Sequence, residues 1–472
     1  MTGKVLLTNI FISNYTGSEL DTLQTAKWFK KNHWDVEVAT LQKKEPLLHL
    51  FAENDIKVTD VWAEQLSSQQ YDLLWGHHWP LISYIIFHEK AVFQKLIHHC
   101  LGALEPLESA VPFHNEIPIY FSISEAVKQI LIDVDGVDEK KIQVFTNSAE
   151  EIYFEKYKTI VPNKLRKIGI ISNHVPEELA ELKEFFEPLG IEVFYIGMYN
   201  NYMLVDVDLI MNYDLIITIG RTVQQCFACG VPVYCYDIYG GPGYIDKNNI
   251  DIAEKFNFSG RGFANKMTCT QIAEDILKNY PNALDNISFL HDIALERYRF
   301  EEKMAKAMKL IDSAPEFNGK MVRERYRQYM RPNEAYIQAW KRMADRENEV
   351  SSLVTRVRKA EADLASKLND IDDMQQRLSK YNVLLTELEK DKNRLEEEKN
   401  RLEEEINRKD NELQHISGLY QQASNDLNCI INSRSWRATK FIRKIVSVLL
   451  PYGSKRRALL KRIFKRSPKK NM

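Results

Sequence analysis

The sequence lacks several features that would place it in other classes of protein. No run of its 472 residues approaches the ~20 apolar residues of a membrane-spanning helix. Its six cysteines have no framework spacing, which excludes a disulfide-rich secreted fold and favours reduced thiols. Cys226 and Cys229 form a single Cys-x-x-Cys pair, so we expect two small side chains packed inside a helix and no zinc site. The first residues, MTGKVLLTNIFIS, have no long apolar core or cleavage site, so we expect a strand there rather than a signal peptide.

Acidic residues are absent from the last stretch of the chain. Residues 427–472 contain 14 Lys or Arg and no Asp or Glu, although the formal net charge of the whole chain is only -2. The preceding 426 residues hold 50 basic and 66 acidic side chains, a formal charge of -16. An acidic body with a basic tail indicates a protein that docks on something anionic.

Apolar runs that alternate with helical patterns fill the first 311 residues. In residues 1–160 the predicted strands include VLLTNIFI, WDVEVATL, YDLLWGHH, QKLIHHCLG, IPIYFSIS and IQVFTN. The pattern restarts in residues 161–311 with RKIGIISNH, a helix between Pro176 and Gly190, and the strands IEVFYIG, YDLIITIG and VPVYCYD. Strands separated by helices predict two α/β, Rossmann-like domains with parallel sheets, whose ligands lie beyond the carboxyl ends of the strands.

A glycine-rich segment follows the last of these strands. Gly240, Gly241 and Gly243 surround Pro242, which predicts an irregular turn that approaches something closely. Because the turn follows a strand end, its backbone N–H groups are candidates for holding a phosphate.

Residues 346–432 have a different composition. Positions seven apart from Val350 to Leu427, together with the positions three residues after each, make 24 core positions, of which four are charged. Twelve heptads without a skip predict a coiled coil on the order of 120 Å long. A single helix would expose its apolar stripe, so we expect a homo-oligomer. A helical linker, residues 312–345, precedes this segment.

The tail, residues 433–472, has two apolar stripes flanked by basic side chains. One stripe contains Phe441, Ile442 and Ile445, and the other contains Leu460 and Phe464. Basic amphipathic helices suit an anionic membrane surface. A solvated basic tail and a nucleic-acid patch are the alternatives, but apolar stripes serve no purpose on a phosphate backbone. We expect no nucleic-acid partner.

With these segments in order, the first 300 or so residues resemble a glycosyltransferase of the GT-B fold, nearest to the family-4 type of bacterial surface polysaccharide synthesis. The matching segments are TGSE after the first strand, DLLWGH at Asp72–His77, SISEAVKQIL, KKIQVFTNS and YDLIITIGRTVQQCFACGVPVYCYD. SRSWRATKFIRK is similar to a segment that follows coiled coils in such enzymes. Two departures stand out. Trp75 replaces the first histidine of the family's Asp-hydrophobic-hydrophobic-His-x-His, and Gln225 replaces the second of two glutamates, the first having no counterpart.

The resemblance implies a donor site in the second domain and an acceptor site in the first. Arg221 is the candidate for stabilising the leaving diphosphate, and Gln225 for binding the ribose. The other donor-site candidates are Asn173, His174, Gly240, Gly241, Gly243 and Tyr244. On the acceptor side, His77 or His78 is the candidate base or sugar contact, and each is also interpretable as a histidine at a strand end. Gly17, Ser18, Glu19, His98 and His99 complete the acceptor-side set, with Ser18 as the expected cap of a helix over residues 18–31.

The function predicted from these features is metal-independent transfer of a sugar from a nucleotide sugar to a lipid-linked cell-surface polysaccharide. No cofactor is expected, because the nucleotide sugar is a substrate. The location expected is the cytoplasmic face of the cell membrane. The alternative is a non-catalytic scaffold that binds a nucleotide sugar and organises partners through its coiled coil.

Overall fold

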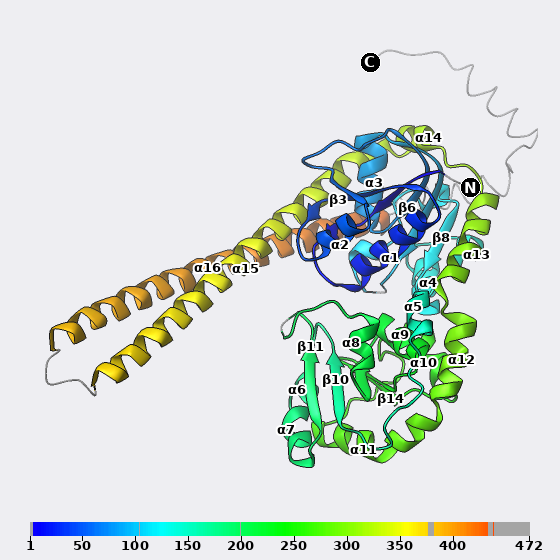
Figure 1. The fold of residues 1–472 in the computed structure, drawn as a ribbon. Coiled ribbons are helices and arrows are strands. Elements are labelled where there is room, and N and C mark those ends of the chain that lie inside the picture. The colour runs from blue at the N-terminus through cyan, green and yellow to red at the C-terminus, as the bar shows by residue number, and fades with distance from the viewer. Residues whose placement is uncertain (1–2, 103, 199, 376–381, 433–437, 439–472) are drawn as a thin grey trace, which may run out of the picture. The chain divides into compact units, whose positions relative to one another are not determined.

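The computed structural model describes residues 3–102, 104–198, 200–375, 382–432 and 438. The chain forms two compact units, residues 1–338 and 339–472. The first unit contains two α/β halves, and long helices dominate the second (Figure 1). In the described part of the chain, no helix combines the length and the apolar character that crossing a bilayer requires.

The first α/β half is built on a seven-stranded sheet in which all neighbouring strands are parallel. In spatial order its strands are β5 (Lys57–Asp60), β3 (Asp35–Thr40), β1 (Lys4–Thr8), β6 (Gln70–Gly76), β7 (Val92–Cys100), β8 (Ile119–Ser122) and β9 (Ile142–Val144). Its helices are α1 (Gly17–Lys31), α2 (Leu47–Glu53), α3 (Trp79–Tyr84) and α4 (Glu125–Asp133), and β2 (Phe11–Ile12) pairs with β4 (Gln42–Lys43). The strand order reverses between β1 and β6. Parallel sheets bind ligands beyond such a reversal, at the carboxyl ends of the strands.

The second α/β half has a five-stranded sheet with a similar reversal. Its strands, in spatial order, are β11 (Glu192–Ile196), β10 (Lys167–Ile171), β12 (Leu215–Thr218), β13 (Val233–Asp237) and β14 (Gly240–Tyr244). Its helices are α5 (Glu151–Glu155), α6 (Glu177–Ala180), α7 (Leu182–Phe186), α8 (Val207–Met211), α9 (Arg221–Cys229), α10 (Ile250–Lys255), α11 (Cys269–Asp285) and α12 (Ile287–Arg297). The order reverses between β10 and β12, and only the edge strand β14 is antiparallel. The α/β fold with parallel sheets that the sequence predicted is thus confirmed.

The helix predicted between Pro176 and Gly190 is divided. Pro176 is the N-cap of α6, and α7 passes into a 3₁₀ turn that contains Pro188, whose ring cannot continue an α-helix. Gly190 ends the segment at φ 71°, a left-handed conformation that glycine adopts without a steric penalty. The boundaries predicted from Pro176 and Gly190 are therefore confirmed, but the prediction of one continuous helix between them was wrong.

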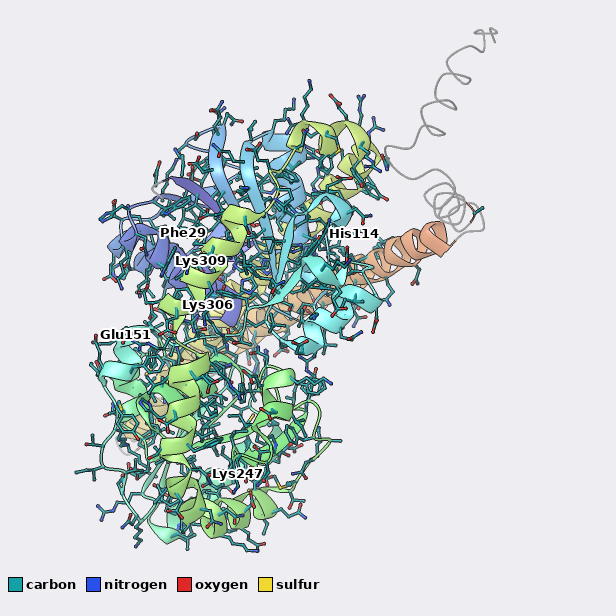
Figure 2. All side chains as sticks on the ribbon, turned by 90° about the vertical axis from the view of Figure 1, so that its right-hand side faces the viewer. Phe29, His114, Glu151, Lys247, Lys306 and Lys309 are labelled. Carbon is teal, nitrogen blue, oxygen red and sulfur yellow. The ribbon has the colours of Figure 1, made fainter. Side chains whose placement is uncertain are left out.

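Helix α13 (Phe300–Ser313), which carries Lys306 and Lys309 (Figure 2), packs into the core of the first half. Phe300, Met304 and Ile311 belong to the same buried cluster as residues of β1 and β6. By its packing, the stretch 300–311 therefore belongs with the first half rather than with the second, to which the sequence pattern assigned it. Helix α14 (Gly319–Arg325) follows it.

The predicted coiled-coil segment forms two helices rather than one rod. Helix α15 (Met330–Gln375) and helix α16 (Asn382–Asn432) run antiparallel, because Glu349 pairs with Lys409 at 2.5 Å and Glu361 pairs with Lys399 at 3.4 Å. Arg346 and Glu412 form a third pair in the same register. Leu353 of α15 and Leu402 of α16 are buried, so the apolar stripe is at least partly covered within one chain. The homo-oligomer stays a prediction, and residues 433–437 and 439–472 of the basic tail lie outside the described part.

Candidate functional site

The two strand-order reversals place most of the candidate residues. His77 and His78 directly follow β6 at the reversal of the first sheet. In the second sheet, Asn173 and His174 follow β10 and Arg221 follows β12, on either side of the reversal. The two halves approach each other here, because Arg221 acts electrostatically on Asp21 of α1.

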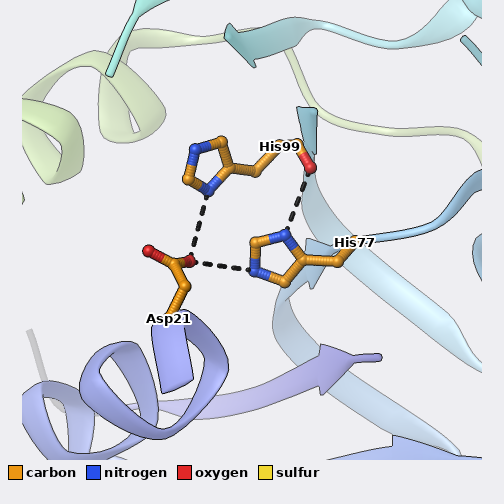
Figure 3. A group of neighbouring side chains, drawn as sticks. All are labelled: Asp21, His77 and His99. Carbon is orange, nitrogen blue, oxygen red and sulfur yellow. Dashed lines mark hydrogen bonds and ion pairs between the residues drawn. The ribbon is translucent and has the colours of Figure 1, made fainter. Parts of the chain in front are cut away.

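Asp21, His77 and His99 form a buried group at the reversal of the first sheet. Figure 3 shows the Oδ2 atom of Asp21 between the two imidazole rings, 3.4 Å from Nε2 of His77 and 3.7 Å from Nδ1 of His99. The three side chains come from α1, the end of β6, and β7, and all three are buried. Among the described residues, this is the group of three His, Cys, Asp or Glu side chains whose geometry would suit a metal ion.

Burial controls the protonation of this group. It lowers the pKa of His77 to about 3 and the pKa of His99 well below the usual value, so both rings are neutral. It also raises the pKa of Asp21 to about 6, against the opposing effect of the Arg221 guanidinium. Nδ1 of His77 lies 3.2 Å from the backbone carbonyl oxygen of His99. A carbonyl only accepts hydrogen bonds, so this nitrogen carries the ring's proton and Nε2 offers a lone pair toward Asp21.

The ring of His78 is fixed by contacts with neighbouring loops. It adopts φ 63°, its Nδ1 accepts a hydrogen bond from the backbone N–H of Ile10 at 3.1 Å, and its Nε2 lies 3.4 Å from Oε1 of Glu108. The other carboxylate oxygen of Glu108 accepts from the backbone N–H of Leu101 at 2.6 Å. His78 therefore connects the loops that follow β1, β6 and β7. This is the structural role that the sequence left open as the alternative to a base or sugar contact.

His98 and His99 diverge, as neighbouring residues of a strand must. The ring of His99 lies beside Asp21, whereas the ring of His98 lies 5.3 Å from the ring of Tyr120. Burial lowers the pKa of His98 to about 3, and neither of its ring nitrogens has a hydrogen-bond partner among the described residues.

Glu19 organises the loop before α1. Its Oε1 accepts from the backbone N–H groups of Ser13 at 2.6 Å and Asn14 at 2.9 Å, and its Oε2 accepts from the hydroxyl of Thr16. Burial raises its pKa, and these hydrogen bonds oppose the effect. The carboxylate predicted to contact acceptor or phosphate is therefore already engaged by its own loop.

The start of α1 corrects a smaller prediction. The helix begins at Gly17, its N-cap is Thr16, and no side chain caps it. Ser18 lies inside the first turn, and its backbone oxygen accepts from the hydroxyl of Thr22 at 2.9 Å. Ser18 is therefore not the cap that the sequence predicted.

Tyr202 links the same loop to the second half, a contact that the sequence did not reveal. Its hydroxyl accepts from the backbone N–H of Tyr15 at 2.7 Å and lies 3.2 Å from Oδ1 of Asn14, to which it donates. The rings of Tyr15 and Tyr202 stack with centroids 5.3 Å apart.

Arg221 is the first residue of α9, where backbone N–H groups and the helix dipole favour an anion. Its Nε and Nη1 atoms are buried and have no hydrogen-bond partner among the described residues. Gln225 lies one helical turn later and is buried. Cys226 and Cys229 of the same helix are buried free cysteines, as predicted.

The polar residues at the neighbouring strand ends are partly engaged. Oδ1 of Asn173 accepts from the backbone N–H of Met198 at 3.0 Å, whereas His174 is exposed. Asp237, at the end of β13, is buried. Burial raises its pKa, and His174 acts on it in the opposite direction.

The glycine-rich segment is the edge strand β14, not the irregular turn predicted from its composition. A Cβ atom on Gly240 would lie 2.1 Å from the carbonyl oxygen of Asn265, and one on Gly241 would lie 2.0 Å from that of Cys235. The backbone N–H of Gly241 donates to the Asn265 oxygen at 3.2 Å, so this donor is engaged within the fold. The close approach at Gly240 and Gly241 is to the protein's own backbone, which removes the reason for assigning phosphate binding there. Gly243 pairs with Cys235 in the same strand pair.

Tyr244 also has a packing role. Its hydroxyl donates to the backbone oxygen of Ile276 at 3.2 Å, and its ring meets that of Tyr234 edge to face. It packs against the buried cluster that includes Ile272 and Ile276 of α11.

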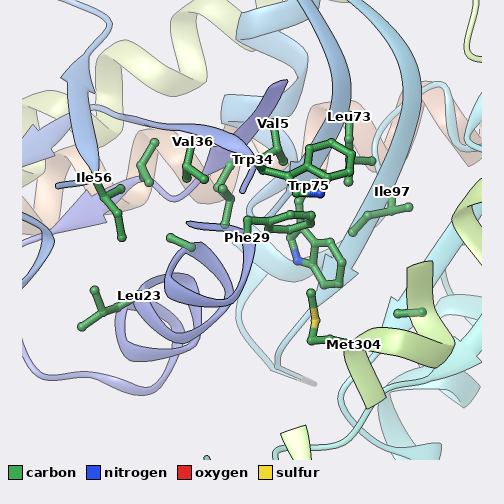
Figure 4. Close-up of a cluster of buried hydrophobic side chains, with 14 of the residues drawn as sticks. Val5, Leu23, Phe29, Trp34, Val36, Ile56, Leu73, Trp75, Ile97 and Met304 are labelled. Atoms are coloured by element: carbon green, nitrogen blue, oxygen red, sulfur yellow. The ribbon is translucent and has the colours of Figure 1, made fainter. Parts of the chain in front are cut away.

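Trp75, which replaces the family's first histidine, lies in the core of the first half (Figure 4). It is fully buried among Phe29, Phe121 and Phe145. The ring of Trp75 lies 6.1 Å from the ring of His99, so an aromatic side chain of the core packs beside this histidine.

Asp21 is the site residue that sequence reasoning missed. It stands two residues after Glu19 within a helix, where an acidic residue is usually a solvated one. The one available signal was its charge as the second residue of LDTLQTA, a stretch whose other members are uncharged.

Comparison with known proteins found no matching family model and no matching curated protein. Similar solved structures are glycosyltransferases. One is a glycosyltransferase from Rickettsia africae, with 14% identity, a TM-score of 0.41, and coverage of 66% of this chain and 98% of that one. Another is a TarM variant from S. aureus, solved with fondaparinux, alpha-GlcNAc-glycerol and UDP, with 9% identity, a TM-score of 0.45, and coverage of 66% and 100%. At these identities and TM-scores, the likenesses establish neither a family nor an activity.

Proposed function

We propose that this protein is a glycosyltransferase of the GT-B type. It transfers a sugar from a nucleotide-sugar donor, bound by the second α/β half, to a cell-surface polysaccharide acceptor held by the first. The observation that carries the proposal is Arg221. Two of its guanidinium nitrogens are buried and have no hydrogen-bond partner in the part of the chain that the structure describes. They lie at the start of α9, beyond the carboxyl ends of the parallel strands and at the strand-order reversal.

The chemistry fits this place in the fold. A nucleotide sugar breaks its glycosidic bond when the leaving diphosphate is stabilised as it gains negative charge. The guanidinium of Arg221 and the N-terminus of α9 supply positive charge there without a metal. Gln225, one turn along α9, has an amide that is able to hydrogen-bond a ribose hydroxyl.

On the acceptor side, His77 is the residue that we assign to the sugars. His77 lies at the reversal of the first sheet, and its ring is neutral. Its neighbour Asp21 is acted on electrostatically by Arg221 of the proposed donor site. His78 and Glu19 are left out of this assignment, because their polar atoms bind neighbouring loops.

The location and the assembly in this proposal rest on the sequence. The basic amphipathic tail would bring the enzyme to the cytoplasmic face of the membrane, where a lipid-linked acceptor is available. The heptads of residues 346–432 would join several chains. Light scattering on this segment tests that part: a monomer at micromolar concentration would confine the pairing to α15 and α16 of one chain.

A second candidate is a nucleotide-sugar-binding scaffold without turnover. Gln225 favours it, because an amide replaces the second glutamate of the family pattern and the first has no counterpart. Such a protein would bind a donor and release no nucleotide.

The test starts with a thermal-shift panel of nucleotide sugars on the full chain. A ligand at 100 times its dissociation constant stabilises the folded state by about 2.7 kcal/mol. Any donor that raises the melting temperature is then incubated with and without candidate glycan acceptors, and release of the nucleoside diphosphate is measured. Binding with acceptor-dependent release supports the enzyme, binding without release supports the scaffold, and no binding across the panel would reject both.

A further inference from the structure

We propose that Asp21, His77 and His99 bind one divalent transition-metal ion, with Zn²⁺ as the matching ion. The site shares His77 with the acceptor side of the proposed function, but metal binding itself does not depend on glycosyl transfer. The expectation of a metal-independent enzyme came from the resemblance, and the sequence gives no sign of this site, because the three residues stand 56 and 22 positions apart and no motif joins them.

The donor set is of the right kind and is already assembled. Each side chain offers one ligand atom, and these atoms lie within 4.8 Å of one another. Oδ2 of Asp21, Nε2 of His77 and Nδ1 of His99 are all buried and without a hydrogen-bond partner among the described residues. Two imidazoles and one carboxylate are common ligands of Zn²⁺ and of other divalent first-row metals.

The orientation of His77 supports a positive charge inside the group. Its Nδ1–H donates to the backbone oxygen of His99, which is the outer contact that metal-binding histidines usually make. This contact leaves the Nε2 lone pair directed at Oδ2 of Asp21 (Figure 3). A lone pair and an ionised oxygen repel each other unless a proton or a metal ion lies between them.

The distances favour the metal ion over a shared proton. A hydrogen bond from a carboxyl group would bring the two atoms to about 2.5–3.0 Å. The observed separations are 3.4 Å to His77 and 3.7 Å to His99. Two ligands on a tetrahedral Zn²⁺ with bonds of about 2.0–2.1 Å stand about 3.3 Å apart.

The surrounding charges permit a dication. One carboxylate and two neutral imidazoles leave the bound ion with a formal charge of +1. Arg221 and Glu108 act on Asp21 with opposite signs, so a negative charge as well as a positive one acts on the group. Lys303, which acts on His99, has a pKa that burial lowers to about 7, so this amine adds less than a full charge. Three protein ligands leave a fourth position for water or a ligand hydroxyl.

The test measures metal in tag-free full-length protein after growth with Zn²⁺ and dialysis. Elemental analysis should find about one Zn²⁺ per chain in the unmodified protein and little in Asp21→Asn and His99→Asn. His98→Asn is the matched control, because His98 is the neighbouring buried histidine on the same strand and points away from Asp21. It should keep its metal.

A second measurement does not depend on any variant folding. The metal-free unmodified protein is titrated with Co²⁺, which should give the visible absorption of a tetrahedral site, and with Zn²⁺, which should raise its melting temperature. If the folded, unmodified protein binds neither ion, the proposal is overturned and a proton on Asp21 holds the group together. Full metal content in His99→Asn, equal to that of His98→Asn, would also overturn it, because the ion would then bind elsewhere.

Discussion

Replacing Arg221 by alanine should strongly weaken binding of a nucleoside diphosphate while leaving the fold intact. The side chain has two buried nitrogens without partners, so its loss breaks no hydrogen bond that the described part of the chain makes to them. In the complex, these two donors would form charge-assisted hydrogen bonds with a diphosphate, each contributing about 1.5–3 kcal/mol. The loss of both should cost at least about 3 kcal/mol, which is roughly a 100-fold weaker affinity.

Isothermal titration with UDP, GDP, ADP and CDP measures this effect, using whichever of the four binds the unmodified protein. Lys247→Ala is the control, because it removes an exposed cation from the same α/β half (Figure 2). Arg221→Lys separates charge from geometry. A lysine keeps the positive charge but loses the planar fork that binds phosphate oxygens in pairs, so it should bind with intermediate affinity. The affinity of Lys247→Ala should lie within about twofold of that of the unmodified protein. If the affinity of Arg221→Ala does so too, Arg221 does not hold the diphosphate.

Three further predictions concern other parts of the chain. Burial raises the pKa of Glu37, but hydrogen bonds from Ser67, Thr59 and Tyr71 outweigh that effect and lower it. Its carboxylate therefore stabilises the folded state above about pH 4.5, and this contribution is lost as the pH falls through the lower pKa of the folded state. Glu37→Gln should unfold at a lower urea concentration than the unmodified protein at pH 7, and it should lose less stability when the pH is lowered. If acidification lowered the stability of Glu37→Gln as much as that of the unmodified protein, the result would contradict this. In residues 346–432, Lys409→Glu should lower the helix melting temperature by facing Glu349, and adding Glu349→Lys should restore it. The alternative outcome, no recovery in the double variant, would mean that α15 and α16 do not pair in this register. Deleting residues 435–472 should release the protein from anionic liposomes but not change transfer to a soluble acceptor, and equal sedimentation of both forms would reject the membrane role.

The parallel sheets were predictable because each buried strand is a short apolar run, and such runs separated by helices have few other solutions. The carboxyl end of β6 was likewise visible, since polar residues follow its apolar ones at His77 and His78. The reversal of strand order was not visible. It depends on which strands pair, and the paired residues of β1 and β6, such as Val5 and Leu73, stand 68 positions apart.

Several candidate residues have contacts within the fold that the sequence did not reveal, and they share a physical cause. Glycines indicate that the backbone approaches something, but they do not say what. At Gly240 and Gly241 the neighbour is the backbone of Asn265 and Cys235 rather than a phosphate. The same holds for Glu19, because a carboxylate beside a predicted site is equally suited to capping the loop on its own side.

The heptads of residues 346–432 show the same limit at a larger scale. A repeat of seven fixes which face of a helix is apolar, and that face is the same whether its partner is another chain or the same chain running backward. Residues 346–432 contain no proline that would predict an end to the helix. What separates the two arrangements is a set of ion pairs between residues far apart in sequence, such as Glu349 with Lys409. Charged residues at core positions were the available sign. Lys399 and Lys409 occupy such positions, and in the hairpin each meets a glutamate of α15.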